Sequence, residues 1–159
     1  MTLQPGQSVV LLNDDALHLP AGTLALPENA RIIIAGRSLV RLTLAELSVP
    51  EAEVVWTDFR QSASLSALHG TLQTAGGLDR MILAADGEES EAMFALMCAV
   101  LTFLPALRRR AGARVELLVE RGRAVSSLVQ FIDRLRPRME ADGITLMVQI
   151  LTRRVEAAA

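Results

Sequence analysis

Four acids have the clearest potential for chemistry in this sequence. All four lie at the carboxyl ends of apolar runs of strand length: Asp14, Asp15, Asp86 and Glu120. Carboxylates gathered where parallel strands end can hold a divalent cation or a cationic ligand. The simpler interpretation is that they are exposed loop acids, and the sequence alone favours it.

Other candidate groups are isolated. His18 and His69 have no acidic or cysteine neighbour at metal-ligand spacing, so we expect no metal site. Cys98 is the only cysteine, which excludes a disulfide within the chain. It lies in the apolar run from Met93 to Leu104, where we expect a buried small side chain rather than a nucleophile.

Composition limits the partners. A net charge of −2 and a pI near 5.7 provide no field to attract nucleic acid or anionic lipid. The longest apolar stretch, Ala92 to Leu107, contains Pro105 and is 16 residues long, short for a bilayer span. No leader-like segment opens the sequence. We therefore expect a cytoplasmic protein with no nucleic-acid or membrane partner.

Apolar runs alternate with segments of helical character. The runs predicted as strands are Val9 to Leu12, Arg31 to Ala35, Val54 to Trp56, Met81 to Ala85, Val115 to Val119 and Thr145 to Leu151. The segments predicted as helices are Ser38 to Leu47, Ser62 to Thr74, Ser90 to Arg110 and Ala124 to Asp142. Leu17 to Pro27, with two prolines and a glycine, is either a short helix or an irregular loop. Pro137 predicts a kink or an early end in the last helix.

This alternation predicts one α/β domain. Strands that are apolar throughout are typical of a parallel sheet covered on both faces. We predict a Rossmann-like, doubly wound parallel sheet of about six strands with helices on both faces. The domain is expected to span residues 1–154, followed by a short tail at 155–159.

The order and spacing of these segments resemble the short-chain dehydrogenase/reductase family over nearly the whole chain. "ARIIIAGRSLVRL" (30–42) is similar to that family's second strand and cofactor-discriminating turn. "EVVWTDFRQSASLSAL" (53–68) and "GLDRMILAADG" (77–87) resemble its third and fourth strands. "AVLTFLPALRRRAGARVELLVE" (99–120) and "LVQFIDRLRPRMEADGITLMVQIL" (128–151) resemble the two helix–strand units that follow.

The family's functional positions are altered. Its glycine-rich cofactor turn falls on Asn13 to Ala21, where bulky residues and two acids replace the glycines. Its Asn-Asn-Ala-Gly signature falls on 84–87 and keeps only Gly87. Its catalytic serine falls near Glu120, and its Tyr-x-x-x-Lys pair has no counterpart, because the chain contains no tyrosine and no lysine. Without a phenol and an ammonium group, the family's proton relay cannot operate.

Two positions still match the family's cofactor site. Arg37 follows the second strand, where the family often binds the 2′-phosphate of NADP, and Asp58 follows the third, where an aspartate meets the adenine. The resemblance implies vestigial cofactor-binding roles for both. The alternative, which the residues themselves favour, is a solvated charge for Arg37 and a turn or helix cap for Asp58.

These observations favour a non-catalytic, truncated relative of the family that acts as a dimeric scaffold or protein-interaction module, with no cofactor. One alternative is a domain that still binds a nucleotide or other small ligand in the crevice where the strands end. Another is an enzyme with new chemistry built on the acids. In the resembled family, two helices pair with those of a second subunit. We therefore predict a homodimer through helices 90–110 and 124–142, and an unidentified protein partner is possible.

Overall fold

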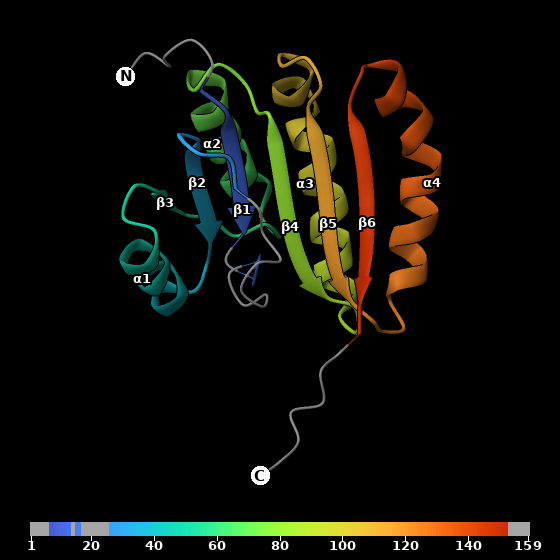
Figure 1. Cartoon of the computed structure of the whole chain (residues 1–159). Coiled ribbons are helices and arrows are strands. Elements are labelled where there is room, and N and C mark those ends of the chain that lie inside the picture. Colours follow the sequence, from blue (N-terminus) through green and yellow to red (C-terminus); the bar gives the residue numbers. More distant parts are fainter. Residues whose placement is uncertain (1–6, 14, 17–25, 153–159) are drawn as a thin grey trace.

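The computed structural model describes residues 7–13, 15–16 and 26–152. These residues form one parallel sheet with helices on both faces (Figure 1). The strands are β1 (Val9–Asn13), β2 (Arg31–Gly36), β3 (Glu53–Trp56), β4 (Arg80–Asp86), β5 (Arg114–Glu120) and β6 (Thr145–Leu151). The helices are α1 (Leu39–Ser48), α2 (Ser62–Thr74), α3 (Ser90–Arg108) and α4 (Val125–Ala141).

The strand order is β3-β2-β1-β4-β5-β6, and every neighbouring pair is parallel. This is a doubly wound Rossmann-type sheet, as the sequence predicts. The order reverses between β1 and β4, and such a switch point is where folds of this class bind their ligands. The predicted helix or loop at Leu17–Pro27 lies almost wholly outside the described residues.

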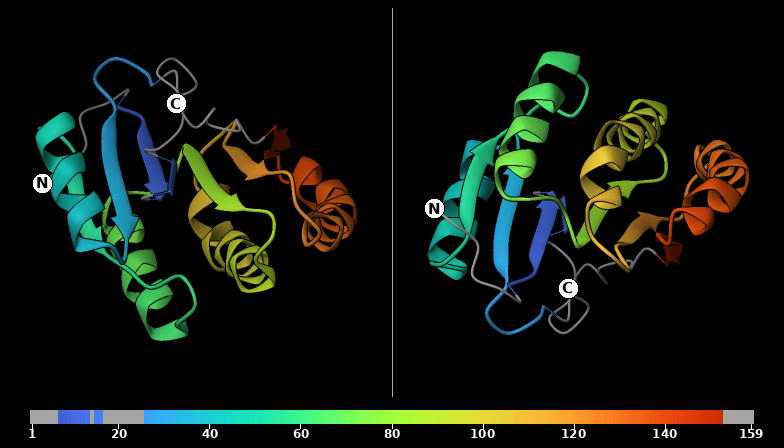
Figure 2. Two further views of the ribbon diagram at one scale, coloured as in Figure 1. Left: turned by 90° about the horizontal axis from the view of Figure 1, so that it is seen from below. Right: turned by 90° about the horizontal axis from the view of Figure 1, so that it is seen from above.

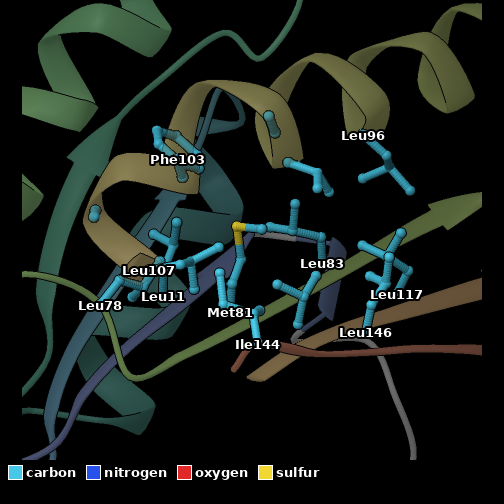
Figure 3. Close-up of a cluster of buried hydrophobic side chains, with 14 of the residues drawn as sticks. Leu11, Leu78, Met81, Leu83, Leu96, Phe103, Leu107, Leu117, Ile144 and Leu146 are labelled. Atoms are coloured by element: carbon cyan, nitrogen blue, oxygen red, sulfur yellow. The ribbon is translucent and has the colours of Figure 1, made fainter. Parts of the chain in front are cut away.

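The larger core lies between the sheet and helices α2, α3 and α4, which cover one face (Figure 2). Alternate strand residues, among them Leu11, Leu83 and Leu117, point into this core and meet Leu96, Phe103 and Leu107 of α3 (Figure 3). Helix α1 covers the other face next to β2 and β3 through Leu42 and Ala45. Because successive strand side chains point to opposite faces of the sheet, they contribute alternately to two separate cores.

By length and composition alone, helix α3 could cross a membrane. It has 19 residues and extends beyond the apolar stretch of 16 residues from Ala92 to Leu107. Its position explains this composition. It lies between α2 and α4 on top of the sheet, and eight of its residues are buried. A helix with neighbours on three sides needs a wide apolar surface.

Pro137 does not end α4. The helix continues through it to Ala141, and Gly143 follows with a φ of 75°. The prediction of an early end at Pro137 is therefore wrong, and the predicted helix over Ala124 to Asp142 is confirmed within one residue at each end. A proline removes only one backbone donor, and packing of Leu135 and Met139 against the sheet holds the last turn in place.

Helices α3 and α4 lie over one face of β5 and β6. On the second face, polar side chains stand beside apolar ones such as Leu118, which is buried, and Met147, which is 49% exposed. Arg80 of β4 donates two hydrogen bonds to Glu116 of β5, at 2.8 Å from Nε and 3.0 Å from Nη2. Thr145 and Gln149 of β6 also lie on this side. The expectation of strands apolar throughout therefore fails for β5 and β6, because their second face is not packed against a helix of the described chain.

Leu128 is a sharp probe of the α4 packing, because it is fully buried against the sheet while its neighbour Ser127 is exposed. Leu128→Asp places an unpaired charge in the core, and we expect a loss of about 3–5 kcal/mol in the free energy of unfolding. Ser127→Asp, the matched control, should change it by less than about 0.5 kcal/mol. Thermal melting followed by circular dichroism measures both. Equal melting temperatures for the two variants would contradict this packing.

Candidate functional site

A small crevice opens where β1, β2, β3 and β4 end, on the side of the switch point. Arg37 and Asp58, the two positions that match the family's cofactor site, both line it. The other lining residues include Asn13, Thr57, Phe59 and Glu89. Its volume is about 110 Å³, well below the roughly 300–1,000 Å³ of ordinary small-molecule pockets. The fold thus brings the expected residues together around a small crevice.

Asn13 closes the gap between β1 and β4. The regular pairing of these strands stops at Leu12 and Ile82. Beyond that point, Asn13 Nδ2 donates to the carbonyl oxygen of Ala84 at 2.7 Å, and the backbone N–H of Ala84 donates to Asn13 Oδ1 at 2.9 Å. One buried side-chain amide therefore continues the ladder across the switch point.

The same amide occupies a backbone donor of the following turn. The N–H of Ala16 donates to Asn13 Oδ1 at 3.2 Å. A pyrophosphate is normally held by free N–H groups in such a turn. In the described part of this turn, the Ala16 N–H is therefore already engaged by the chain itself.

The described acids do not form one cluster, although two of them are neighbours. Asp15 forms an ion pair with Arg41 in the first turn of α1. Asp86 accepts a hydrogen bond from the N–H of Glu88 at 2.9 Å and lies beside Glu120 in the strand register. Among the described residues, no three metal-binding side chains come together. Asp14 lies outside the described residues, so its place in the acidic cluster stays a prediction.

Asp58 has the structural role that the residues favour. Its Oδ1 accepts the N–H of Arg60 at 3.0 Å and its Oδ2 accepts from Gln61 Nε2 at 3.1 Å. These bonds build the turn that leads into α2. Arg37, by contrast, is exposed at the end of β2 and lines the crevice.

Thr57 is a residue that the sequence analysis missed. It is 1% exposed and lines the crevice between β3 and α2, and its hydroxyl has no hydrogen-bond partner. A buried hydroxyl without a partner costs about 1–3 kcal/mol. Among the described residues that line the crevice, Thr57 has a buried hydroxyl that forms no hydrogen bond.

Two glycines bring the loops after β4 and β5 into contact. Gly87 follows β4 and Gly122 follows β5, and a Cβ added to Gly122 would lie 2.2 Å from the Gly87 carbonyl carbon. The N–H of Ala124 also donates to the Gly87 carbonyl oxygen at 2.8 Å. The β5–α4 connection consists only of Arg121 to Ala124, so this contact holds the two loops close together.

Solved structures of low sequence identity share this fold, whereas no family model and no curated protein matches the sequence. Carbonyl reductase Sniffer of D. melanogaster is 12% identical, with a TM-score of 0.70 over 89% of this chain and 79% of that one. The short-chain dehydrogenase/reductase YIR035C of Saccharomyces cerevisiae is 13% identical, with a TM-score of 0.69 over 91% and 70%. BdcA, a protein of E. coli solved in complex with NADPH, is 16% identical, with a TM-score of 0.62 over 90% and 69%.

The chain is thus a Rossmann-type α/β domain. More specifically, it has the fold of the short-chain dehydrogenases/reductases, with the strand order and helix positions that the resemblance implies.

The Gly87–Gly122 contact yields a direct test. Gly122→Ala forces a methyl group into the Gly87 backbone, and we expect it to lower the free energy of unfolding by about 1–3 kcal/mol or more. Gly70, in α2, has nothing within 4 Å of an added Cβ. Gly70→Ala should therefore raise the free energy of unfolding by roughly 0.5–1 kcal/mol through its helix propensity. Urea unfolding of both variants measures the difference, and a Gly122→Ala variant as stable as wild type would mean that the loops do not touch.

Proposed function

We propose that this chain is a non-catalytic relative of the short-chain dehydrogenases/reductases that acts as a dimeric scaffold or protein-interaction module in the cytoplasm. The observation that carries the proposal is the closure of the switch point, where the Asn13 amide bonds both backbone groups of Ala84. The Gly87–Gly122 contact supports it on the substrate side. Both features support a domain whose β1, β4 and β5 ends are held together by the chain itself.

The absence of catalytic residue types adds support. The chain has no tyrosine and no lysine, and Glu120 stands where the family has its serine. A carboxylate that already lies beside Asp86 does not replace a hydroxyl nucleophile or proton relay. The role that this leaves for a folded domain of the family is binding.

Thr57 favours a second candidate, a small ligand in the residual crevice. The buried Thr57 hydroxyl lacks a partner, and the Arg37 guanidinium lies on the same crevice. Together they suit a ligand with one anionic group and a hydrogen-bonding edge, about the size of inorganic phosphate in a space of about 110 Å³.

Calorimetric titration separates the two candidates. We expect no NADPH or NADH binding up to millimolar concentration, because the turn donor at Ala16 is already occupied. A dissociation constant in the low micromolar range, about 7–8 kcal/mol of binding, would contradict the first proposal. Inorganic phosphate is the probe for the second. Binding that is lost in Thr57→Val and in Arg37→Gln would support the residual crevice, and Gln61→Ala, at the far side of the turn, is the control.

Catalysis has its own assay. Purified protein with NADPH should reduce no ketone or aldehyde of a standard panel, and Glu120→Ser should not create activity. The two closures, not one missing side chain, are expected to exclude the reaction. Any turnover above the no-enzyme rate that depends on the cofactor would show that this reasoning is wrong.

The proposal includes a homodimer through helices 90–110 and 124–142. The fold determines which side chains of these helices are exposed and so can form the interface. The stripe Val125, Leu128, Ile132 faces the sheet, so it is not the interface. The outer surface of α3 instead presents Phe94 and Leu101, which are 64% and 48% exposed. They line an apolar groove of about 830 Å³ between α2 and α3. Cys98, which is half-buried and not fully buried as expected, also lines it.

Phe94→Arg tests this interface. An arginine in the centre of an apolar contact removes a large anchor and adds a charge that must lose its water, so we expect the dimer to dissociate to 17.2 kDa monomers. Glu46→Arg, on the exposed side of α1, is the control for added positive charge. Sedimentation at micromolar concentration decides. A variant of unchanged mass would remove α3 from the interface.

A further inference from the structure

The small crevice at the strand ends is rich in charge. Among the described residues, five charged side chains line it: Asp15, Arg37, Asp58, Arg60 and Glu89. A charge that is already paired within the chain contributes little to a ligand, whereas an unpaired charge seeks a partner of opposite sign. The pairing of these five groups therefore decides which chemistry the crevice can bind.

Three of the five charges are engaged by the chain itself. Asp15 forms an ion pair with Arg41 of α1. Asp58 accepts the backbone N–H of Arg60 at 3.0 Å in the turn before α2. The Arg60 guanidinium donates to Glu91 Oε2 at 2.9 Å, on the first turn of α3. These side chains hold the walls of the crevice in place and are not its binding groups.

Arg37 and Glu89 are the remaining charges, one of each sign. Within the part of the chain that the structure describes, neither side chain has an ion pair or a hydrogen bond, and both residues are exposed. Glu89 is the N-cap residue of α3, yet its carboxylate accepts no bond from that helix. The crevice thus offers a ligand one guanidinium and one carboxylate.

Thr57 supplies a third group inside the crevice. Its hydroxyl is buried, with 1% of the residue exposed, and forms no hydrogen bond. A hydroxyl can both donate and accept, and buried polar groups normally have a partner. The position of Thr57 in the crevice lining indicates that a ligand atom provides this partner.

The volume limits the ligand to a few atoms. The crevice measures about 110 Å³. An apolar cavity of about 150 Å³ is large enough for benzene, so the crevice has room for about four or five non-hydrogen atoms. Glycine, the smallest amino acid, is of this size, and amino acids with long side chains are too large.

We propose that the crevice binds a small zwitterion, an α-amino acid of the size of glycine. Arg37 pairs with the carboxylate of the ligand, Glu89 pairs with its ammonium group, and the Thr57 hydroxyl donates to a carboxylate oxygen. A simple anion would leave Glu89 unpaired, and a simple cation would leave Arg37 unpaired. The proposal rests on the second candidate function, the ligand in the residual crevice, and specifies the chemistry of that ligand.

Titration followed by the backbone amide signals in NMR spectra compares glycine with its two halves, acetate and methylammonium. We expect glycine to bind about tenfold or more tightly than either, because each charge-assisted hydrogen bond adds to the affinity. Leucine should bind at least about tenfold more weakly than glycine, because its side chain exceeds the crevice. Glycine that binds no better than acetate overturns the proposal.

Inorganic phosphate separates this proposal from the one on which it rests. If phosphate binds at the crevice and glycine has no advantage over acetate, the crevice remains a ligand site and the zwitterion is wrong. If no probe shifts the signals of the crevice residues, the second candidate function and the zwitterion are both wrong. The dimeric scaffold is tested by sedimentation and depends on neither result.

Two charge-removing variants assign the ends of the ligand. Glu89→Gln should weaken glycine about tenfold, to the affinity of acetate, and should not weaken acetate. Arg37→Gln should abolish acetate binding and leave methylammonium binding in place. Glu88→Gln is the matched control, because Glu88 is exposed, lies 3.5 Å from Arg123 and does not line the crevice. A Glu89→Gln variant that binds glycine as tightly as wild type, or no more weakly than Glu88→Gln does, shows that the proposal is wrong.

Discussion

The bridge between Asn13 and Ala84 is the contact on which the character of this domain depends. In a doubly wound sheet, the chain leaves β1 in one direction and returns to β4 from the other, so the two strand ends separate and leave unpaired backbone groups. A dinucleotide fold uses that gap for its ligand. Here a single amide fills it, donating to the Ala84 carbonyl and accepting from the Ala84 N–H. Each such buried bond contributes about 1 kcal/mol, and more if its partner would otherwise be unpaired. The ends of β1 and β4 are thereby joined through a buried side chain of the chain itself.

The loops after β4 and β5 are joined by a different kind of contact. At Gly87 and Gly122 two backbones approach closer than any residue with a Cβ allows, and the short β5–α4 connection leaves no loop to line a pocket. The fold tolerates both contacts because its stability comes from elsewhere. The core between the sheet and α2, α3 and α4 depends on strand residues that alternate with those facing α1, and none of them is needed for catalysis. Scaffold and site are therefore separable in this architecture.

The distribution of apolar surface then points toward binding. The position of α3 between α2 and α4 explains why this long helix is apolar, so its composition is no argument for a second subunit. The argument for a second subunit at α3 rests on the exposed side chains Phe94 and Leu101. The larger concentration of exposed apolar side chains is on α1 and β3, at the other end of the sheet. A domain with a small crevice and two separate apolar surfaces is suited to assembling copies of itself or holding a partner between them.

The sequence by itself determined the elements and their order. Each predicted strand and helix is present in the described residues, because hydrophobic periodicity of 2 or 3.6 is a local signal that burial enforces. It also placed Arg37 and Asp58 at one crevice, since residues after parallel strands meet at one edge. Only the tertiary structure decided what that edge does. The Asn13 amide reaches a residue 71 positions away, and Leu128 and Leu44 are equally apolar in the sequence although one is fully buried and the other is 55% exposed. The spacing of residues in the sequence does not show which residues pair across the sheet or which apolar helix residues face the core. Both depend on the neighbours that the fold brings together.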